Sequence, residues 1–229
     1  MALFIGYGKL TKSLVELLDD RKITIFSRTK EKVLEGIKEH SHIQWRSPNS
    51  FHKEREVWLL LPNDQVRPFL EKYDRFFHEE TIFYFCATKG RLGDYEHLLS
   101  EKQKMIPVKF ITEARQLKKD KKGLAAIPYH CSDYEVTLQK WFGKRIEVVF
   151  AEEEQVFFIN QTATRKAIEL MEEMRYELVN QGISQKLIDH AGLQIVPGVI
   201  RSYLEDQLGG FGKQVVEEMN RKREGHENG

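Results

Sequence analysis

Two glycines near the start of the chain have a spacing suited to holding a phosphate-bearing ligand. Gly6 and Gly8 follow a short apolar run, and an amphipathic stretch begins at Lys9. Glycine at the first position lets the chain turn sharply out of a strand, and glycine at the second leaves room for a pyrophosphate beside the backbone. The N–H groups that open the following helix then face the anion. The segment Gly6-Tyr7-Gly8-Lys9-Leu10, called the phosphate cradle below, therefore predicts dinucleotide binding, although a plain tight turn would use the same glycines.

The residues about twenty positions later indicate which dinucleotide would bind. An acidic residue usually stands there to hold the ribose 2′-hydroxyl of NAD, and this chain has Ser27-Arg28-Thr29-Lys30 instead. Arg28 offers a planar fork of donors that matches phosphate oxygens, and the hydroxyls of Ser27 and Thr29 can add hydrogen bonds. The alternative is that the cations only decorate a solvated helix start. Because a cation is mildly unfavourable at a helix N-terminus, an anionic ligand there explains the pattern better, and we predict NADP(H).

The elements that position these residues alternate between β-rich runs and amphipathic helical stretches. Residues 57–61 are continuously apolar, as a strand buried on both faces must be. Strands that alternate with helices imply βαβ units, hence a Rossmann-type α/β fold with a mostly parallel sheet and helices on both faces. The expected strands are residues 2–6, 23–27, 43–46, 57–61 and 81–86, and the expected helices are residues 9–20, 30–40 (capped by Thr29), 65–77 and 94–101.

The second half of the chain changes character near residue 152. Sheet-forming sequence ends at residue 150, and the pattern from Glu152 onward is helical. Gly182 is placed to end a long helix, and Pro197 should kink or break the next one. We therefore predict an NADP-binding domain over residues 1–151 and a small all-helical domain over 152–229. Before that boundary we expect strands at 108–111, 124–129 and 146–150, a helix at 134–142 and a lysine-rich loop at 118–122; after it we expect helices at 154–180, 184–208 and 215–223.

The helical domain carries more apolar surface than a helical hairpin can hide within itself. Such a surface must pack on the first domain or on another subunit. We predict a homodimer made through the C-terminal helices. The apolar residues concerned are Ile168, Leu170, Met171, Met174, Leu178, Leu187, Ile188, Leu193, Ile195, Val196, Val199, Ile200 and Leu204.

Composition and charge argue against several classes of protein. The 229-residue chain has 41% hydrophobic and 31% charged residues and a net charge of +1, so nothing in it calls for a nucleic-acid or membrane partner. Its apolar runs are far shorter than a membrane span. The first expected strand follows Met1 almost at once, which leaves no room for a secretory signal and predicts a cytoplasmic protein. Cys86 and Cys131 are too few for a disulfide framework or a metal site.

With these residues in view, the chain resembles the pyrroline-5-carboxylate reductase family, including its late-competence-protein branch. Residues 4–10 look like the family's FIGxGxM, and Ser27-Arg28-Thr29 resembles the end of its second strand. Residues 57–62 are similar to its VxLxVKP stretch without the lysine. Residues 83–87 fall where the family has its SxxAG segment, and residues 182–198 are similar to its GLxxxxA…QTVxG helix.

The resemblance implies a fold, a reaction and further site residues. The fold is a Rossmann domain followed by a helical dimerisation domain, and the reaction is hydride transfer from NADPH to the C=N bond of a cyclic imine, which makes proline. Leu61 and Pro62 would border the cofactor, and Cys86 and Ala87 would lie near the nicotinamide. In the family, backbone and hydroxyl groups of the helical domain bind the imine at the dimer interface. The family's SGSGPA and SPGGTT segments, which should fall near residues 158–164 and 208–212, are not preserved here.

Three residues of the long helix are candidates for chemistry. Thr162 and Thr164 are the best-placed hydroxyls for a substrate contact, although threonines inside a helix also bond back to their own helix. Lys166 resembles the lysine that polarises the substrate oxygen in β-hydroxyacid dehydrogenases, although a helical lysine is more often solvated. The sequence thus leaves two main hypotheses, besides a third in which the chain is a purely structural Rossmann-like protein that binds no nucleotide. One is an NADPH-dependent oxidoreductase that acts on a small imine or carbonyl, and the other is a catalytically inactive NADP-binding protein with a regulatory or redox-sensing role.

Overall fold

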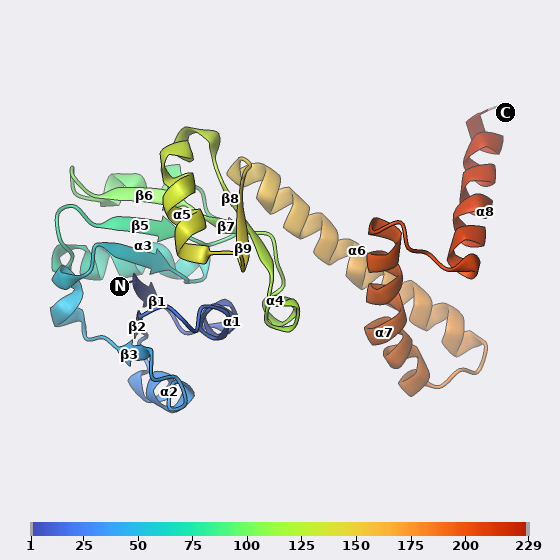
Figure 1. The fold of residues 1–229 in the computed structure, drawn as a ribbon, viewed down its shortest axis with the longest axis horizontal. Helices are drawn as coiled ribbons and strands as arrows, with labels where there is room; N and C mark the ends of the chain where they lie inside the picture. The colour runs from blue at the N-terminus through green and yellow to red at the C-terminus, as the bar shows by residue number, and fades with distance from the viewer. Residues whose placement is uncertain (1, 228–229) are drawn as a thin grey trace. The chain divides into compact units, whose positions relative to one another are not determined.

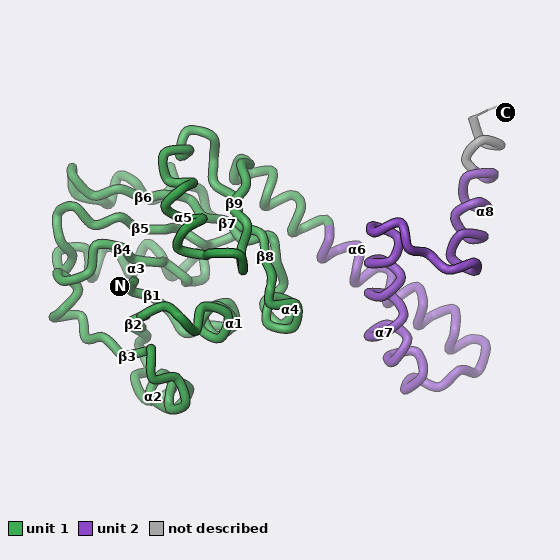
Figure 2. The backbone as a smooth tube through the Cα atoms, viewed as in Figure 1, with its two compact units in different colours: residues 1–162 green, residues 163–229 purple. Residues whose placement is uncertain are grey.

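The computed structural model describes residues 2–227, and the side chains of residues 2–222. The chain divides into two compact units, residues 1–162 and residues 163–229 (Figure 2). The first is called the sheet unit and the second the helical unit. Sheet-forming sequence ends near residue 150, and the sheet unit continues into the long helix as far as Thr162.

A six-stranded parallel sheet forms the centre of the sheet unit (Figure 1). Its strand order is β3-β2-β1-β4-β5-β6, in which the direction of strand addition reverses between β1 and β4. This confirms the Rossmann-type α/β fold. The strands are β1 (Ala2–Ile5), β2 (Ile23–Phe26), β3 (Ile43–Trp45), β4 (Glu56–Leu59), β5 (Ile82–Phe85) and β6 (Lys104–Pro107), and the helices between them are α1 (Lys9–Leu17), α2 (Lys30–Gly36) and α3 (Asn63–Tyr73).

Alternate residues of each strand pack into two separate apolar layers. Phe4 of β1 lies in the layer that includes residues of α1 and α2, whereas Leu3 lies in the layer that includes Phe69 and Leu70 of α3. This division follows from the two-residue repeat of a strand. Both faces of the sheet are therefore covered, and the continuous apolar runs of the sequence are explained.

A second, smaller sheet completes this unit. Its strands β7 (Lys109–Phe110), β8 (Gly123–Ile127) and β9 (Ile146–Phe150) run in that order, with β7 antiparallel to β8. The helices α4 (Ala114–Asp120) and α5 (Glu135–Phe142) belong to this region. The strands predicted at 108–111, 124–129 and 146–150 are thus present, but they form their own sheet.

Three local predictions were wrong. Residues 94–101 do not form an α-helix; they make the 3-10 turns Leu92–Asp94 and Glu96–Leu98, because side-chain bonds such as Arg91 N–H to Asp94 Oδ2 (3.0 Å) close short turns instead. Residues 118–120 of the lysine-rich stretch predicted as a loop belong to α4, at whose start the Glu113 carboxylate accepts the N–H of Gln116. The sixth parallel strand, β6, was not predicted, because it contains Pro107, and proline is tolerated only where a strand lies at a sheet edge.

The helical unit continues α6 (Glu153–Asn180) and adds α7 (Gln185–Leu204) and α8 (Gly210–Glu227). Gly182 ends α6 as predicted: its φ is +76°, its N–H donates to Val179 O, and the N–H of Ile183 donates to Leu178 O. Pro197 lies inside α7 without breaking it, contrary to the expected interruption, and the last helix is longer than predicted. No described helix is apolar over enough of its length to span a bilayer.

Candidate functional site

The two glycines of the phosphate cradle are required for different reasons. Gly6 leaves β1 with φ +105°, and a Cβ there would lie 2.5 Å from the carbonyl oxygen of Leu60. The fold itself therefore demands glycine at this position. At Gly8, by contrast, a Cβ would meet no protein atom within 4 Å. The packing of the protein does not explain Gly8, whereas a ligand close to the backbone would.

Gly8 is also the N-cap residue of α1, and no side chain caps this helix. The N–H groups of the first turn are consequently available to an anion. The third position of the glycine pattern is Thr11, whose side chain is fully buried. The helix therefore accommodates a residue larger than the usual glycine or alanine against the sheet.

An open pocket of about 360 Å³ lies beside the cradle. Gly6, Tyr7 and Gly8 form one wall, Ser27 and Arg28 at the end of β2 form another, and Leu61 and Pro62 follow β4. These are residues that the sequence predicted to bind the cofactor, and the fold brings them to one cavity at the carboxyl edge of the sheet. Open α/β sheets bind ligands at this edge, where the strand order reverses.

Arg28 is an exposed cation in the pocket wall. It forms no ion pair or hydrogen bond with any residue that the structure describes, so its donors remain available. Thr29 occupies the predicted N-cap position of α2, but its side chain makes no capping hydrogen bond. Lys30 lies over the ring of Trp45, with Nζ 4.5 Å from the centroid, and is therefore held by the protein itself.

The opposite wall of the pocket comes from α3 and was missed by the sequence reasoning. Gln65, Lys72 and Tyr73 line it together with Pro68 and Phe69. Lys72 gives the pocket a second cation beside Arg28, and the rings and proline give it an apolar side. No local signal marks these residues, because only the packing of α3 on the sheet brings them to the cradle.

Other residues of the cradle have structural contacts. The hydroxyl of Tyr7 lies against Gly36 of α2, and burial raises the pKa of Tyr7. The ammonium of Lys12 lies 5.1 Å from the centre of the Tyr7 ring. Lys9 is exposed, and Leu10 packs on the apolar core. Tyr7 therefore links the cradle to α2.

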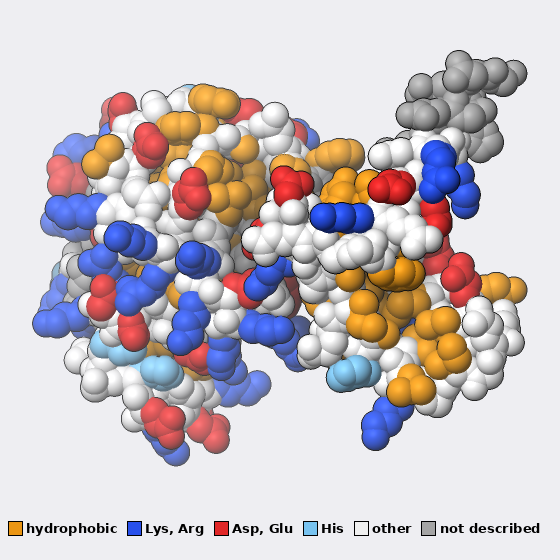
Figure 3. Space-filling model, turned by 45° about the vertical axis from the view of Figure 1, so that its right-hand side comes forward, with side chains coloured by type: hydrophobic (Ala, Val, Ile, Leu, Met, Phe, Trp, Pro, Cys, Tyr) orange, Lys and Arg blue, Asp and Glu red, His pale blue; other side chains and the backbone are white. Residues whose placement is uncertain are grey.

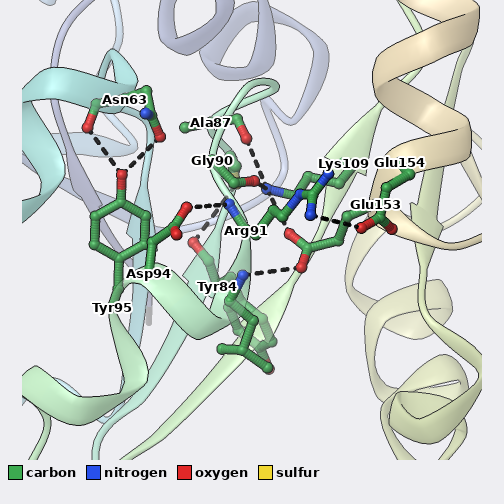
Figure 4. A network of polar contacts seen from close by, with 12 residues as sticks. Asn63, Tyr84, Ala87, Gly90, Arg91, Asp94, Tyr95, Lys109, Glu153 and Glu154 are labelled. Atoms are coloured by element: carbon green, nitrogen blue, oxygen red, sulfur yellow. Dashed lines mark hydrogen bonds and ion pairs between the residues drawn. The ribbon is translucent and has the colours of Figure 1, made fainter.

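The loop after β5 begins with Cys86 and Ala87, which the resemblance in sequence predicted to lie near a nicotinamide and which do not line the pocket beside the cradle. Cys86 and Ala87 are both buried, and the structure shows a network of polar contacts behind them (Figure 4). Its centre is Lys109 of β7, whose Nζ donates to the carbonyl oxygens of Ala87 (2.6 Å) and Gly90 (2.9 Å). The same Nζ pairs with Glu153 Oε2 of α6 at 2.9 Å. Sequence reasoning missed this cluster, because lysine is seldom buried.

Burial and neighbouring charges shift the pKa values of the buried titratable groups. Burial lowers the pKa of Lys109, and the charge of Glu153 opposes that shift. Burial also raises the pKa of both thiols, that of Cys131 to about 11. Both cysteines are free, as predicted. No group of three or more His, Cys, Asp or Glu side chains in the described part of the chain is arranged to hold a metal ion.

The three candidates for chemistry lie on the solvent-exposed surface of α6. Thr162 ends the sheet unit, while Thr164 and Lys166 belong to the helical unit. Lys166 pairs with Glu169 on its own helix at 2.7 Å. One turn before them, the amide of Asn160 donates to the carbonyl oxygen of Phe110 at 3.0 Å and ties α6 to β7.

Comparisons with known proteins reveal a shared fold. No family model matches the chain, and no curated protein matches it in sequence. A pyrroline-5-carboxylate reductase from Coxiella burnetii has a similar structure, with a TM-score of 0.73 and 13% identity over 97% of this chain and 90% of that one. The pyrroline carboxylate reductase of Plasmodium falciparum, solved with NADP bound, gives 0.63 and 12% over 98% and 91%. An imine reductase from Streptomyces aurantiacus gives 0.62 and 12% over 98% and 78%.

These likenesses establish a Rossmann-like sheet followed by an all-helical region, as in those enzymes. The Rossmann-type sheet and the all-helical region expected from the resemblance in sequence are thereby confirmed.

Proposed function

We propose that this chain is an NADPH-dependent oxidoreductase that reduces a small imine or carbonyl compound. The observation that carries the proposal is Gly8, which its protein neighbours do not require and which leaves open space at the N-terminus of α1. Beside that space lies a pocket whose wall includes Arg28, an exposed side chain with no partner among the described residues. The P. falciparum neighbour was solved with NADP bound, which agrees with this assignment.

In this proposal, different residues of the sheet unit bind different parts of the dinucleotide. The cradle holds the pyrophosphate through backbone N–H groups. Ser27, Arg28 and Thr29 bind the 2′-phosphate, and Lys72 adds a second positive charge. Leu61 and Pro62 border the ligand, and the loop that begins at Cys86 and Ala87 lies beside the ring that supplies the hydride.

The substrate contacts are proposed for α6. Thr162 or Thr164 would donate a hydrogen bond to the substrate, and Lys166 would supply a proton or polarise its oxygen or nitrogen. Because pyrroline-5-carboxylate reductases share this fold, pyrroline-5-carboxylate is the first substrate to test, and proline synthesis is the corresponding role.

A homodimer through the C-terminal helices is part of the proposal. Among residues 163–222, only Ile188 is buried. Apolar side chains gather on the surface of the helical unit, as Figure 3 shows, and Leu193 is 72% exposed. A second copy that covers these helices would remove this surface from water.

The test begins with calorimetric titration of the full chain with NADPH and NADH. We expect NADPH to bind more tightly, and NADPH at 100 times its dissociation constant should stabilise the protein by about 2.7 kcal/mol. Absence of heat from both dinucleotides would refute the proposal. NADPH oxidation is then measured with pyrroline-5-carboxylate and a panel of imines and keto acids.

A catalytically inactive NADP-binding regulator or redox sensor is the second candidate. The observation that favours it is that Lys166, the proposed proton donor, is already paired with Glu169 on its own helix. Tight NADPH binding without turnover of any substrate would select this function over catalysis.

A further inference from the structure

Lys109 is a buried ammonium group whose surroundings occupy it completely. Its side chain is 2% exposed. Its Nζ has the carbonyl oxygens of Ala87 and Gly90, the carboxylate of Glu153, and the ring of Phe85 with its centroid at 3.6 Å as partners. Since every direction around the ammonium is taken, Lys109 acts on a ligand only through the loop that it holds.

The contact with Ala87 fixes the orientation of a peptide group. Its carbonyl oxygen points toward Lys109, and the described peptide bonds are all trans. In a planar trans peptide the N–H lies opposite the carbonyl, so the N–H of Thr88 points away from the ammonium. No residue that the structure describes accepts a hydrogen bond from the N–H groups of residues 87–90. The N–H of Thr88 is therefore a donor without an acceptor among the described residues, and it faces away from Lys109.

Contacts at the end of the loop keep it in this conformation. Glu153, which pairs with Lys109, also accepts the N–H of Leu92 at 2.9 Å through its other oxygen. Gly90 is packed so closely that an added Cβ would collide with the amide oxygen of Asn63. The side chain of Asn63 is itself held by the Tyr95 hydroxyl at 2.7 Å (Figure 4). The loop is consequently set by buried contacts with α3, β7 and α6.

The loop lies where the reactive half of the dinucleotide is expected. The pocket with Arg28 is lined by residues that follow β1, β2 and β4, and the loop follows β5, the next strand beyond β4 in the sheet. A dinucleotide that crosses this edge with its adenosine at Arg28 brings its nicotinamide toward β4 and β5. The carboxamide of the nicotinamide needs a donor for its oxygen, and a free backbone N–H supplies one.

We propose that Lys109 is a positioning residue that, with Glu153, orients the 87–90 loop so that the N–H of Thr88 binds the nicotinamide carboxamide. This inference rests on the proposed function, since it needs a bound dinucleotide. It assigns to the buried ion pair a role in holding the nicotinamide half of the ligand and none in holding the adenosine half.

The test compares two ligands on the full chain. NADPH contains the nicotinamide, whereas adenosine 2′,5′-bisphosphate contains only the adenosine half with its 2′-phosphate. For Lys109→Met we expect the dissociation constant of NADPH to rise roughly tenfold, as the loss of one good hydrogen bond would cause. The dissociation constant of the bisphosphate should stay within about twofold of the original value.

The control is Lys102→Met, which removes an exposed lysine whose partner is Glu79 at 3.0 Å. It should leave the affinity for both ligands unchanged. If Lys109→Met does not fold, the double variant Lys109→Met with Glu153→Gln removes both charges and leaves no unpaired buried ion. For this double variant we again expect a higher dissociation constant for NADPH and an unchanged one for the bisphosphate.

The outcomes separate the inference from the proposed function. Equal weakening of both ligands in the variant, or an unchanged affinity for NADPH, would overturn the positioning role while NADP binding by the original chain stands. An original chain that binds neither ligand would overturn the proposed function, and the inference with it.

Discussion

The sheet unit and the helical unit differ in how far each buries its own apolar side chains. In the sheet unit, Phe4 and Phe83 are fully buried in opposite layers of one sandwich. In the helical unit, Ile188 is the single buried residue among 163–222, while Leu193 and Leu204 remain largely exposed. The first unit therefore buries an apolar core of its own, whereas the second leaves most of its apolar side chains exposed.

The largest effect on the stability of the sheet unit is expected from a substitution at Gly6. Gly6→Ala introduces a side chain at positive φ and within 2.5 Å of a backbone oxygen. We expect the free energy of unfolding to fall by about 3 kcal/mol, as urea denaturation would measure. An unchanged urea midpoint would show that the turn after β1 rearranges at little cost in free energy. The packing around Gly6 would then constrain the sheet unit less than the structure indicates.

Gly8→Val is the matched change at the ligand side of the same turn. Because a Cβ added at Gly8 would meet no atom within 4 Å apart from its chain neighbours, stability should change by no more than about 1 kcal/mol, mainly through the poorer N-cap. NADPH binding should be lost, since the side chain fills the space for the pyrophosphate. Calorimetry that detects normal NADPH binding by this variant would show that the cradle does not hold the ligand.

The incompleteness of the helical unit is tested with a charge on its apolar surface. Leu193→Asp should weaken the proposed dimer by about 2–3 kcal/mol, because a carboxylate would be buried without a partner. Light scattering at micromolar concentration should then report a monomer. Val136→Asp is the control, because Val136 is 76% exposed on α5 of the sheet unit. A monomeric original chain, or equal effects of the two changes, would contradict the proposed interface.

The selectivity of the sheet unit is tested at Arg28. Arg28→Asp replaces an unpaired donor group with a charge that repels the 2′-phosphate. We expect the dissociation constant of NADPH to rise about thirtyfold, roughly 2 kcal/mol, with a much smaller change for NADH. Lys30→Met serves as the comparison, because Lys30 is already engaged by Trp45. Equal losses for both dinucleotides would exclude the 2′-phosphate role.

The smallest effect is expected at Lys166 in the helical unit. Its ion pair with Glu169 lies on the surface, where such pairs contribute little. Lys166→Met should therefore leave the melting temperature and NADPH affinity unchanged. A loss of turnover with unchanged NADPH binding would assign Lys166 a catalytic role. A loss of NADPH affinity would contradict the proposal that residues of the sheet unit bind the cofactor.

Sequence reasoning succeeded where the signal is local. The strand β1, the turn at Gly6 and the end of α6 at Gly182 are each determined by neighbouring residues, through apolar repeats or through a backbone conformation that favours glycine. It failed at α4, where Leu117 is the one buried residue and no repeat is visible. It also did not predict that β7, β8 and β9 form a sheet of their own, because the sequence of one strand does not determine which other strand it pairs with.

The candidate site shows the same limit. Arg28 could be predicted, because it follows β2 at the distance usual for ribose recognition. Lys72 could not, since only the packing of α3 brings it to the same pocket. Lys109 was the least predictable, because its partners Ala87, Gly90 and Glu153 come from two distant segments of the chain.

All three tryptophans, Trp45, Trp58 and Trp141, belong to the sheet unit, and the last two stack at 4.7 Å between ring centres. Tryptophan fluorescence, excited selectively over that of Tyr176 and Tyr203 in the helical unit, will consequently monitor the melting of the sheet unit alone. Far-ultraviolet circular dichroism receives a large contribution from α6, α7 and α8. Thermal scans that record both optical signals will therefore distinguish one cooperative transition from two separate ones without any engineered label.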